Sequence, residues 1–177
     1  MRLVISILAD DRTGIVREIT DHVLQRNCNI LDSQMATLEG IFAMNMLVEG
    51  EPMEMAALEQ HLWQEAEEGR LSVALRKSTP PGQDSEGKIL DIHVSALDHP
   101  GIVNGIARFF SDQGINILRM ETRAGTAPHT ASPTFTVSMR VLLPSDIDPV
   151  ALRRAFGEYC EEAALDCQIT HPSGEAA

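Results

Sequence analysis

The hexapeptide Asp11–Val16 (DRTGIV) returns 87 residues later as Asp98–Val103 (DHPGIV). Three further pairs of segments align at the same offset: Leu3–Ile7 with Leu90–Val94, Ile19 with Ile106, and Asn29–Leu31 with Asn116–Leu118. A repeat of this length indicates that each copy is a complete structural unit that buries its own apolar face. The sequence therefore predicts two related domains.

The composition is that of a folded globular protein, since 44% of the 177 residues are hydrophobic and 23% are charged. The formal net charge of −12 repels polyanions, which argues against direct binding to nucleic acid or to an anionic membrane. The three cysteines cannot all pair within one chain and show no CxxC spacing, so free thiols in a reducing compartment are favoured. The apolar opening Leu3–Ala9 is too short for a signal peptide or a membrane anchor. We therefore expect a cytoplasmic protein.

Hydrophobic periodicity gives each repeat the order strand, helix, strand, strand, helix, strand. In the first repeat the strands are expected near residues 3–9, 31–37, 42–48 and 71–75, and the helices near 14–26 and 51–66. The second helix of each repeat is expected to bury a four-residue stripe: Met55, Leu58, Leu62 and Ala66, and Leu152, Phe156, Tyr159 and Ala163. This order predicts an α+β protein of two ferredoxin-like βαββαβ domains, each an antiparallel sheet with both helices on one face.

The domain boundaries follow from the repeat and from one polar stretch rich in Pro and Gly. We expect a first domain at residues 1–78, a linker at 79–87, a second domain at 88–171 and a frayed tail at 172–177. In the first domain the open face of the sheet carries apolar groups at Val4 and Leu8. We therefore expect the domains to associate and the chain to form a homo-oligomer, a dimer or larger.

A catalytic or metal-binding set of side chains is not evident in the sequence. The six histidines lack the i, i+4 pairing of a metalloprotease helix, and no GxSxG elbow is present. Asp91 and His93 point out of one strand toward the open sheet face, where a solvated or interdomain face is the simpler interpretation. The sequence therefore predicts no enzyme, no bound metal and no cofactor.

The repeated turn is the best candidate for a binding site. Gly14 and Gly101 stand where a strand passes into a helix, so unpaired N–H groups of the helix N-terminus could receive a carboxylate. Asn29 and Asn116 begin the next strand and are expected to lie beside that turn, where an amide could bind both ends of an amino acid. The alternative is that the glycines only permit the turn and the asparagines only cap it.

These motifs resemble the ACT domain, a module that binds small amino acids in regulatory proteins. The second repeat resembles more specifically the tandem-ACT glycine cleavage system transcriptional repressor group, through Asp98–Val103, Phe109–Phe110, Ile115–Ile117, Glu121–Thr122, Ala127–His129 and Pro133–Phe135. The resemblance implies a ligand at ACT-domain interfaces, with contacts from Asp11, Arg12, Thr13, Gly14 and Asn29 in one copy and from Asp98, His99, Pro100, Gly101 and Asn116 in the other. Because the two loops differ at their central residues, equal affinity at both is not expected.

The resemblance implies a non-enzymatic regulator that senses glycine or another small amino acid. No helix-turn-helix is left once both repeats are assigned, so we expect any effect on transcription to pass through a partner protein. The alternative is a detached regulatory subunit of an amino-acid or folate pathway enzyme, because ACT units also occur attached to such enzymes. A stand-alone enzyme is the third and least supported possibility.

Overall fold

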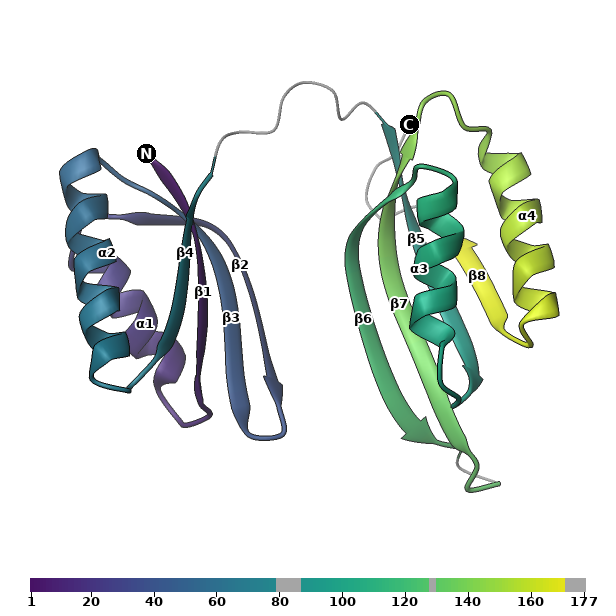
Figure 1. Ribbon diagram of the computed structural model, residues 1–177, viewed down its shortest axis with the longest axis horizontal. Coiled ribbons are helices and arrows are strands. Elements are labelled where there is room, and N and C mark those ends of the chain that lie inside the picture. Colours follow the sequence, from purple (N-terminus) through teal and green to yellow (C-terminus); the bar gives the residue numbers. More distant parts are fainter. Residues whose placement is uncertain (79–86, 128–129, 171–177) are drawn as a thin grey trace. The chain divides into compact units, whose positions relative to one another are not determined.

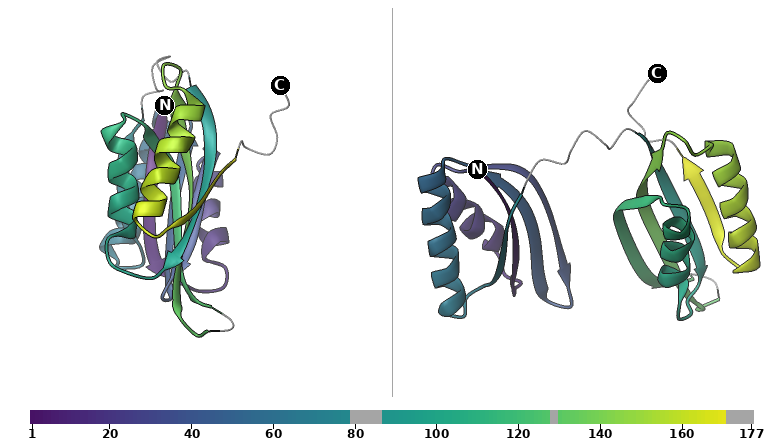
Figure 2. Two further views of the ribbon diagram at one scale, coloured as in Figure 1. Left: turned by 90° about the vertical axis from the view of Figure 1, so that its right-hand side faces the viewer. Right: turned by 45° about the horizontal axis from the view of Figure 1, so that its top comes forward.

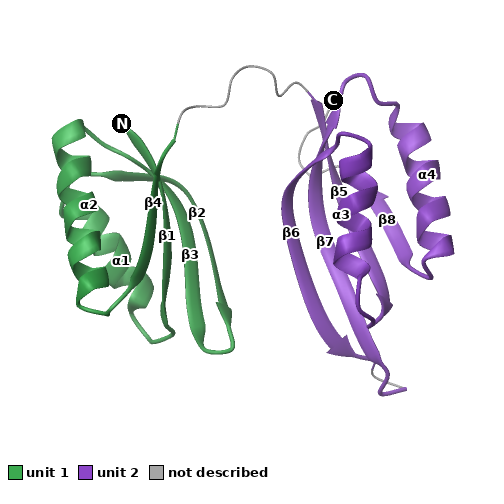
Figure 3. Cartoon of the chain, in the orientation of Figure 1, with its two compact units in different colours: residues 1–80 green, residues 81–177 purple. Residues whose placement is uncertain are grey.

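The computed structural model describes residues 1–78, 87–127 and 130–170. The chain divides into two compact units, residues 1–80 and 81–177 (Figure 3). The predicted linker falls outside the described residues except for Gly87, and the predicted tail at 172–177 falls outside them entirely. None of the described helices is long and apolar enough to cross a membrane.

Unit 1 is a four-stranded antiparallel sheet covered on one face by two helices (Figures 1 and 2). Its elements are β1 (Arg2–Asp10), α1 (Ile15–Leu24), β2 (Asn29–Leu38), β3 (Ile41–Glu49), α2 (Pro52–Glu67) and β4 (Ser72–Lys77). The strand order is β2-β3-β1-β4, which places the first strand in the interior of the sheet.

Unit 2 repeats this arrangement with the order β6-β7-β5-β8. Its elements are β5 (Gly87–Leu97), α3 (Ile102–Asp112), β6 (Asn116–Thr126), β7 (Pro133–Pro144), α4 (Pro149–Glu162) and β8 (Asp166–Thr170). Even the irregularities repeat, because the register shifts at Ile30/Asp32 in one sheet and at Ile117/Arg119 in the other. The predicted pair of ferredoxin-like domains is confirmed.

Each unit buries its own core between the sheet and its helices. In unit 1 alternate residues of β1 are buried together with every fourth residue of α1, and these are Leu3, Ile5, Ile7, Ile15, Ile19 and Val23. In unit 2 the helices add an aromatic group, in which the ring centroids of Phe110 and Phe156 lie 5.0 Å apart. Because the two cores share no buried residue, each unit buries the apolar face of its own sheet with its own helices.

Two stripe predictions were inexact near the ends of the helices. On α2 the last buried residue is Glu65 and not Ala66, and on α4 it is Cys160, while the expected Tyr159 and Ala163 are only partly buried against the core. Both errors are shifts of one residue, which move the contact by 100° around a helix, and the wider apolar stripe tolerates them. Glu65 is the one buried charged residue among the described parts of the chain.

Gly14 and Gly101 are the residues at which each first strand turns into its helix. Their φ angles are +93° and +100°, in the left-handed region that side chains with a Cβ disfavour. A Cβ built at either position meets nothing within 4 Å. The backbone conformation, and not lack of space, therefore requires glycine at both turns.

Two glycine-to-alanine substitutions in unit 2 test whether the backbone conformation, and not a lack of space, requires glycine at the turn. We expect Gly101→Ala to lower the free energy of unfolding by about 1–2 kcal/mol, because the left-handed conformation penalises a Cβ. Gly157 lies inside α4, where an added Cβ also meets nothing within 4 Å and φ is not positive. There, Gly157→Ala should raise the free energy of unfolding by about 0.5–1 kcal/mol. Urea denaturation followed by the fluorescence of Tyr159, the single tyrosine, measures both changes, and two changes of the same sign would contradict this account.

Candidate functional site

The two repeated turns form equivalent loops at the same corner of their respective units. We call Asp11–Gly14 the first loop and Asp98–Gly101 the second loop. The backbone N–H of Asp11 donates to the Gly40 carbonyl at 2.9 Å, and that of Asp98 donates to the Pro133 carbonyl at 3.0 Å. Each loop is thus fixed to the end of the neighbouring strand or hairpin, and the helix behind it begins at a defined place.

The helices that follow these loops begin without a side-chain cap. Gly14 and Gly101 occupy the N-cap positions of α1 and α3, and neither can supply a side-chain acceptor. By contrast, α2 begins with a capping box of Glu51 and Glu54, and Asp148 accepts from two backbone N–H groups at the start of α4. Uncapped N–H groups and the positive end of the helix dipole together favour a bound anion.

Each loop borders a hollow of a size suited to a small molecule. The hollow at the first loop has a volume of about 390 Å³, and its lining includes Asp11, Arg12, Gly14, Thr37 and Phe42. The hollow at the second loop has a volume of about 530 Å³, and its lining includes Asp98, His99, Gly101, Asn104 and Phe135. In each hollow a carboxylate and a helix N-terminus lie beside an aromatic ring.

The polar side chains of the two loops are arranged differently. In the first loop the Arg12 guanidinium donates to the carboxylate of Glu18, one turn into α1, at 2.5 Å. In the second loop His99 Nδ1 donates to the carbonyl of Pro100 at 3.1 Å, which leaves Nε2 as the outward ring nitrogen. Thr13 stands where the second loop has this proline. The first loop therefore offers a fixed cation, whereas the second offers an imidazole.

Asn116 does not lie beside the second loop, so the predicted corner of Gly101 with Asn116 was wrong. Asn116 pairs with Leu142 on β7, and Leu142 pairs in turn with Ile89 near the start of β5. The second loop follows Leu97 at the opposite end of β5. Eight residues of strand at about 3.3 Å each separate the two places by roughly 26 Å.

Asn29 is misplaced in the same way in unit 1. It pairs with Glu49, which also pairs with Arg2 at the start of β1, while the first loop follows Asp10 at its end. The helix between loop and asparagine carries the chain back along the sheet, and this return separates them. Within one unit, the loop hollow is therefore built without its asparagine.

The open sheet face of unit 2 carries the polar pair that the sequence placed there. The Arg140 guanidinium donates to both oxygens of Asp91, at 2.7 and 3.0 Å, and this hydrogen bonding lowers the pKa of the Asp91 carboxyl. His93 Nδ1 lies 3.1 Å from the Ser138 hydroxyl. Because these groups satisfy one another on an exposed face, they form a solvated surface network and not a catalytic set.

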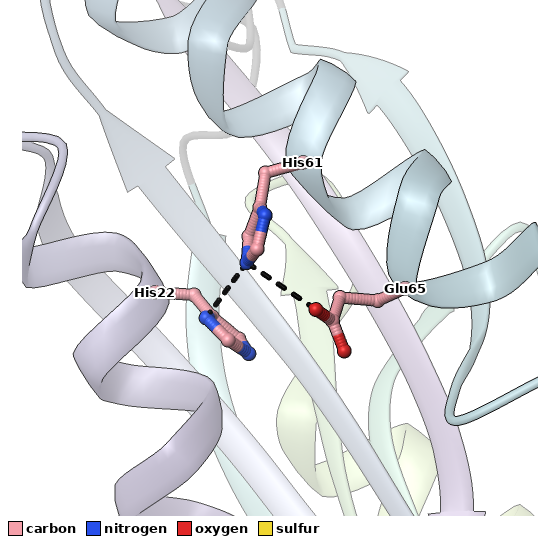
Figure 4. Close-up of side chains that lie close together, drawn as sticks. All are labelled: His22, His61 and Glu65. Carbon is pink, nitrogen blue, oxygen red and sulfur yellow. Dashed lines mark hydrogen bonds and ion pairs between the residues drawn. The ribbon is translucent and has the colours of Figure 1, made fainter. Parts of the chain in front are cut away.

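A cluster that the sequence interpretation missed lies between the two helices of unit 1. His22 on α1 faces His61 and Glu65 on α2 (Figure 4). His61 Nε2 lies 2.9 Å from His22 Nδ1 and 3.6 Å from Glu65 Oε1. We call these three residues the histidine–glutamate cluster. The available signal was the i, i+4 spacing of His61 and Glu65, but only the packing of α1 on α2 brings in His22.

Electrostatic interactions shift the pKa values of two groups in the cluster. The Arg70 guanidinium donates to both Glu65 oxygens, at 2.5 and 2.8 Å, and this hydrogen bonding lowers the pKa of the Glu65 carboxyl against the effect of its burial. Desolvation, assisted by the positive charge of Arg26, lowers the pKa of His61. The lowered pKa values favour the charged carboxylate of Glu65 and the neutral imidazole of His61.

Comparison with known proteins places the chain in a family. Residues 1–76 match the ACT domain model. The glycine cleavage system transcriptional repressor of Escherichia coli is 27% identical over 160 residues, which cover 90% of this chain and 84% of that protein. A UPF0237 protein of Methanocaldococcus jannaschii is 38% identical over 69 residues, which cover 38% of this chain and 77% of that protein.

Solved structures agree on the fold of the whole chain. A protein of unknown function from Galdieria sulphuraria superposes with a TM-score of 0.77 at 25% identity, over 96% of this chain and 97% of that one. A candidate glycine cleavage system transcriptional repressor superposes with a TM-score of 0.71 at 22% identity, over 96% and 95%. The first unit therefore belongs to the ACT-domain family, and the chain as a whole is similar to the glycine cleavage system transcriptional repressors.

Proposed function

We propose that the protein is a non-enzymatic regulator that binds a small amino acid at its loops and acts on transcription through a partner protein. Family membership supports the regulatory role. The ligand and the partner are inferred from the chemistry of the site and from the charge of the chain.

The observation that carries the ligand proposal is the contrast between capped and uncapped helices. α2 and α4 satisfy their N-termini with side chains, while α1 and α3 leave theirs open beside a hollow. An amino-acid carboxylate can accept hydrogen bonds from the first-turn N–H groups of α3. Its ammonium can donate to the Asp98 carboxylate, which lines the same hollow. The two charged ends of a zwitterion are thus recognised by two adjacent groups.

The aromatic wall of each hollow also bears on the ligand side chain. Phe135 on β7 lines the hollow at the second loop, and Phe42 on β3 lines the hollow at the first. An apolar ring wall offers no hydrogen bond to a polar side chain and leaves room for a hydrogen or a small alkyl group. Glycine and other small amino acids carry a side chain of this kind.

The two loops are proposed to differ in affinity. Arg12 already pairs with Glu18, so a carboxylate at the first loop competes with that ion pair for the guanidinium. The second loop has no such competitor among its own residues Asp98, His99, Pro100 and Gly101. We therefore assign the tighter site to the second loop.

The action on transcription is proposed to be indirect. The net charge of −12 opposes approach to DNA phosphates. All four described helices pack on sheets of βαββαβ units, so none of them belongs to a helix-turn-helix. A partner protein that contacts DNA is the remaining route by which a ligand bound here changes gene expression.

The open sheet face of unit 1 supports self-association. Val4 and Leu8 on this face are 39% and 50% exposed, and the paired residues Leu38 on β2 and Ile41 on β3 add exposed apolar side chains to the same face. A contiguous apolar surface of this kind is typical of an interface. We propose that it joins copies of the chain into a homo-oligomer.

Calorimetric titration with a panel of small amino acids tests the ligand site. We expect binding by the unmodified protein and a loss of about tenfold or more in affinity for Asp98→Asn, because the variant removes the charge opposite the ammonium. Asp11→Asn should reduce binding at the first loop only. Millimolar glycine, alanine and serine that produce no heat with the unmodified protein would exclude the site.

Asn116→Ala serves as the matched control for this measurement. Because Asn116 begins β6, beyond the C-terminal end of α3, affinity should stay unchanged if the site is complete within one unit. A lower affinity that appears only at concentrations where the chain oligomerises would show that a second copy supplies the asparagine. An Asp98→Asn variant that binds as well as the unmodified protein would contradict the proposed ammonium contact.

Light scattering at micromolar concentration tests the oligomer. We expect the unmodified chain to be a dimer or larger, and we expect Leu8→Lys to shift it toward the monomer, because a charge on the open face resists burial. Leu24→Lys is the control, since Leu24 is 71% exposed on α1, away from that face. Equal behaviour of the two variants would argue against the open face as the interface.

A further inference from the structure

The histidine–glutamate cluster of unit 1 has the composition and geometry of a transition-metal site. His22, His61 and Glu65 each offer one ligand atom, and these atoms all lie within 4.8 Å of one another. Two imidazoles and one carboxylate are a ligand set that Zn²⁺ accepts, with a fourth position open to solvent. We propose that this cluster binds a divalent transition metal, with Zn²⁺ as the best match.

The distances fit a tetrahedral ion. Ligand atoms bonded to zinc at about 2.0–2.1 Å lie roughly 3.3 Å from one another at tetrahedral angles. The two measured separations, 2.9 Å between the histidines and 3.6 Å between His61 and Glu65, bracket this value. The third separation, between His22 and Glu65, is at most 4.8 Å, and side-chain rotations that shorten it would bring the three atoms into place.

The contact between the two imidazoles is one that a cation can replace. His22 Nδ1 faces His61, and His22 Nε2 is buried with no hydrogen-bond partner among the described residues. The contact between the two imidazoles holds only while one nitrogen carries the shared proton and the other accepts it. A cation coordinated by both rings replaces that proton.

The surroundings position the carboxylate and leave an access path. Arg70 holds Glu65 by two hydrogen bonds, and a carboxylate fixed in this way by an outer partner is typical of metal sites. One lone pair on Glu65 Oε1 is still directed to the histidines. A pocket of about 350 Å³ opens both histidines to solvent, and its lining includes the acidic residues Glu18 and Asp21. Ions can therefore enter between α1 and α2.

The site spans the two helices and uses none of the residues proposed to contact the amino acid, although Gly14 also lines the pocket that leads to it. His22 lies near the end of α1, and His61 and Glu65 lie one turn apart on α2. A bound ion would thus tie the two helices of unit 1 together. Offset by 87 residues, unit 2 has Phe109 in place of His22, and this ring packs against Phe156 with centroids 5.1 Å apart. The site is therefore specific to unit 1.

Fluorescence makes a unit-specific test possible in the full-length chain. Trp63, the single tryptophan, lies on α2 between His61 and Glu65, and the single tyrosine, Tyr159, lies in unit 2. We expect Zn²⁺, added to protein cleared of metal with a chelator, to raise the thermal unfolding midpoint reported by Trp63. The midpoint reported by Tyr159 should not move. Mg²⁺ should shift neither signal, because it prefers oxygen ligands in octahedral geometry.

Calorimetric titration with Zn²⁺ then identifies the ligands. We expect one equivalent to bind, and we expect His61→Gln and His22→Gln each to lower the association constant by at least about tenfold. His93→Gln removes an exposed histidine of unit 2 and should leave zinc binding unchanged. Far-UV circular dichroism confirms that each variant is folded, and two independent histidine variants keep the test valid if one of them is not.

Three results would overturn the assignment. The first is zinc binding of equal strength in His22→Gln, His61→Gln and the unmodified chain. The second is a zinc-induced shift confined to the Tyr159 signal, which would place the ion in unit 2. The third is the absence of any Zn²⁺-dependent heat or stabilisation in the unmodified protein.

Discussion

The strand-to-helix turn at Gly14, repeated at Gly101, is the constraint on which the rest of the structure depends. Each glycine adopts a left-handed φ, so the chain reverses within a few residues and returns its helix across the strand it has just left. That return buries Ile15, Ile19 and Val23 against the sheet. Because glycine occupies the N-cap, the same turn leaves the helix N-terminus uncapped, and one backbone feature thereby serves both the fold and the proposed ligand site.

Duplication has kept the architecture and has let the side chains between the helices diverge. The two sheets share strand order and even the position of one register shift. The space between the helices is aromatic in unit 2, where Phe109, Phe110 and Phe156 meet, and polar in unit 1, where His22 and His61 meet. A repeated backbone therefore supports different chemistry in the same place, because the helix positions are fixed by the turns and not by the residues they bring together.

The open sheet faces of the two units differ in polarity, and this difference suits them to different contacts. The open face of unit 1 has an apolar portion at Val4 and Leu8, whereas that of unit 2 carries the Asp91–Arg140 pair. An apolar face gains stability from being covered, and a face of mutually satisfied charges loses little by remaining in water. The two units are thus similar in fold and are suited to different contacts.

The sequence by itself determined the two-domain βαββαβ fold, the helix stripes up to one residue, and the places where glycine is required. These follow from local spacing, since periods of 2 and 3.6 residues and a repeated turn depend on neighbours in the chain. Only the tertiary structure decided which polar groups meet. The asparagines Asn29 and Asn116 were expected beside the loops and lie roughly 26 Å away, because the helix between each loop and its asparagine carries the chain back to the opposite end of the strands. His22 and His61 are 39 residues apart and meet at 2.9 Å, because contacts between helices depend on packing angles that no local pattern contains.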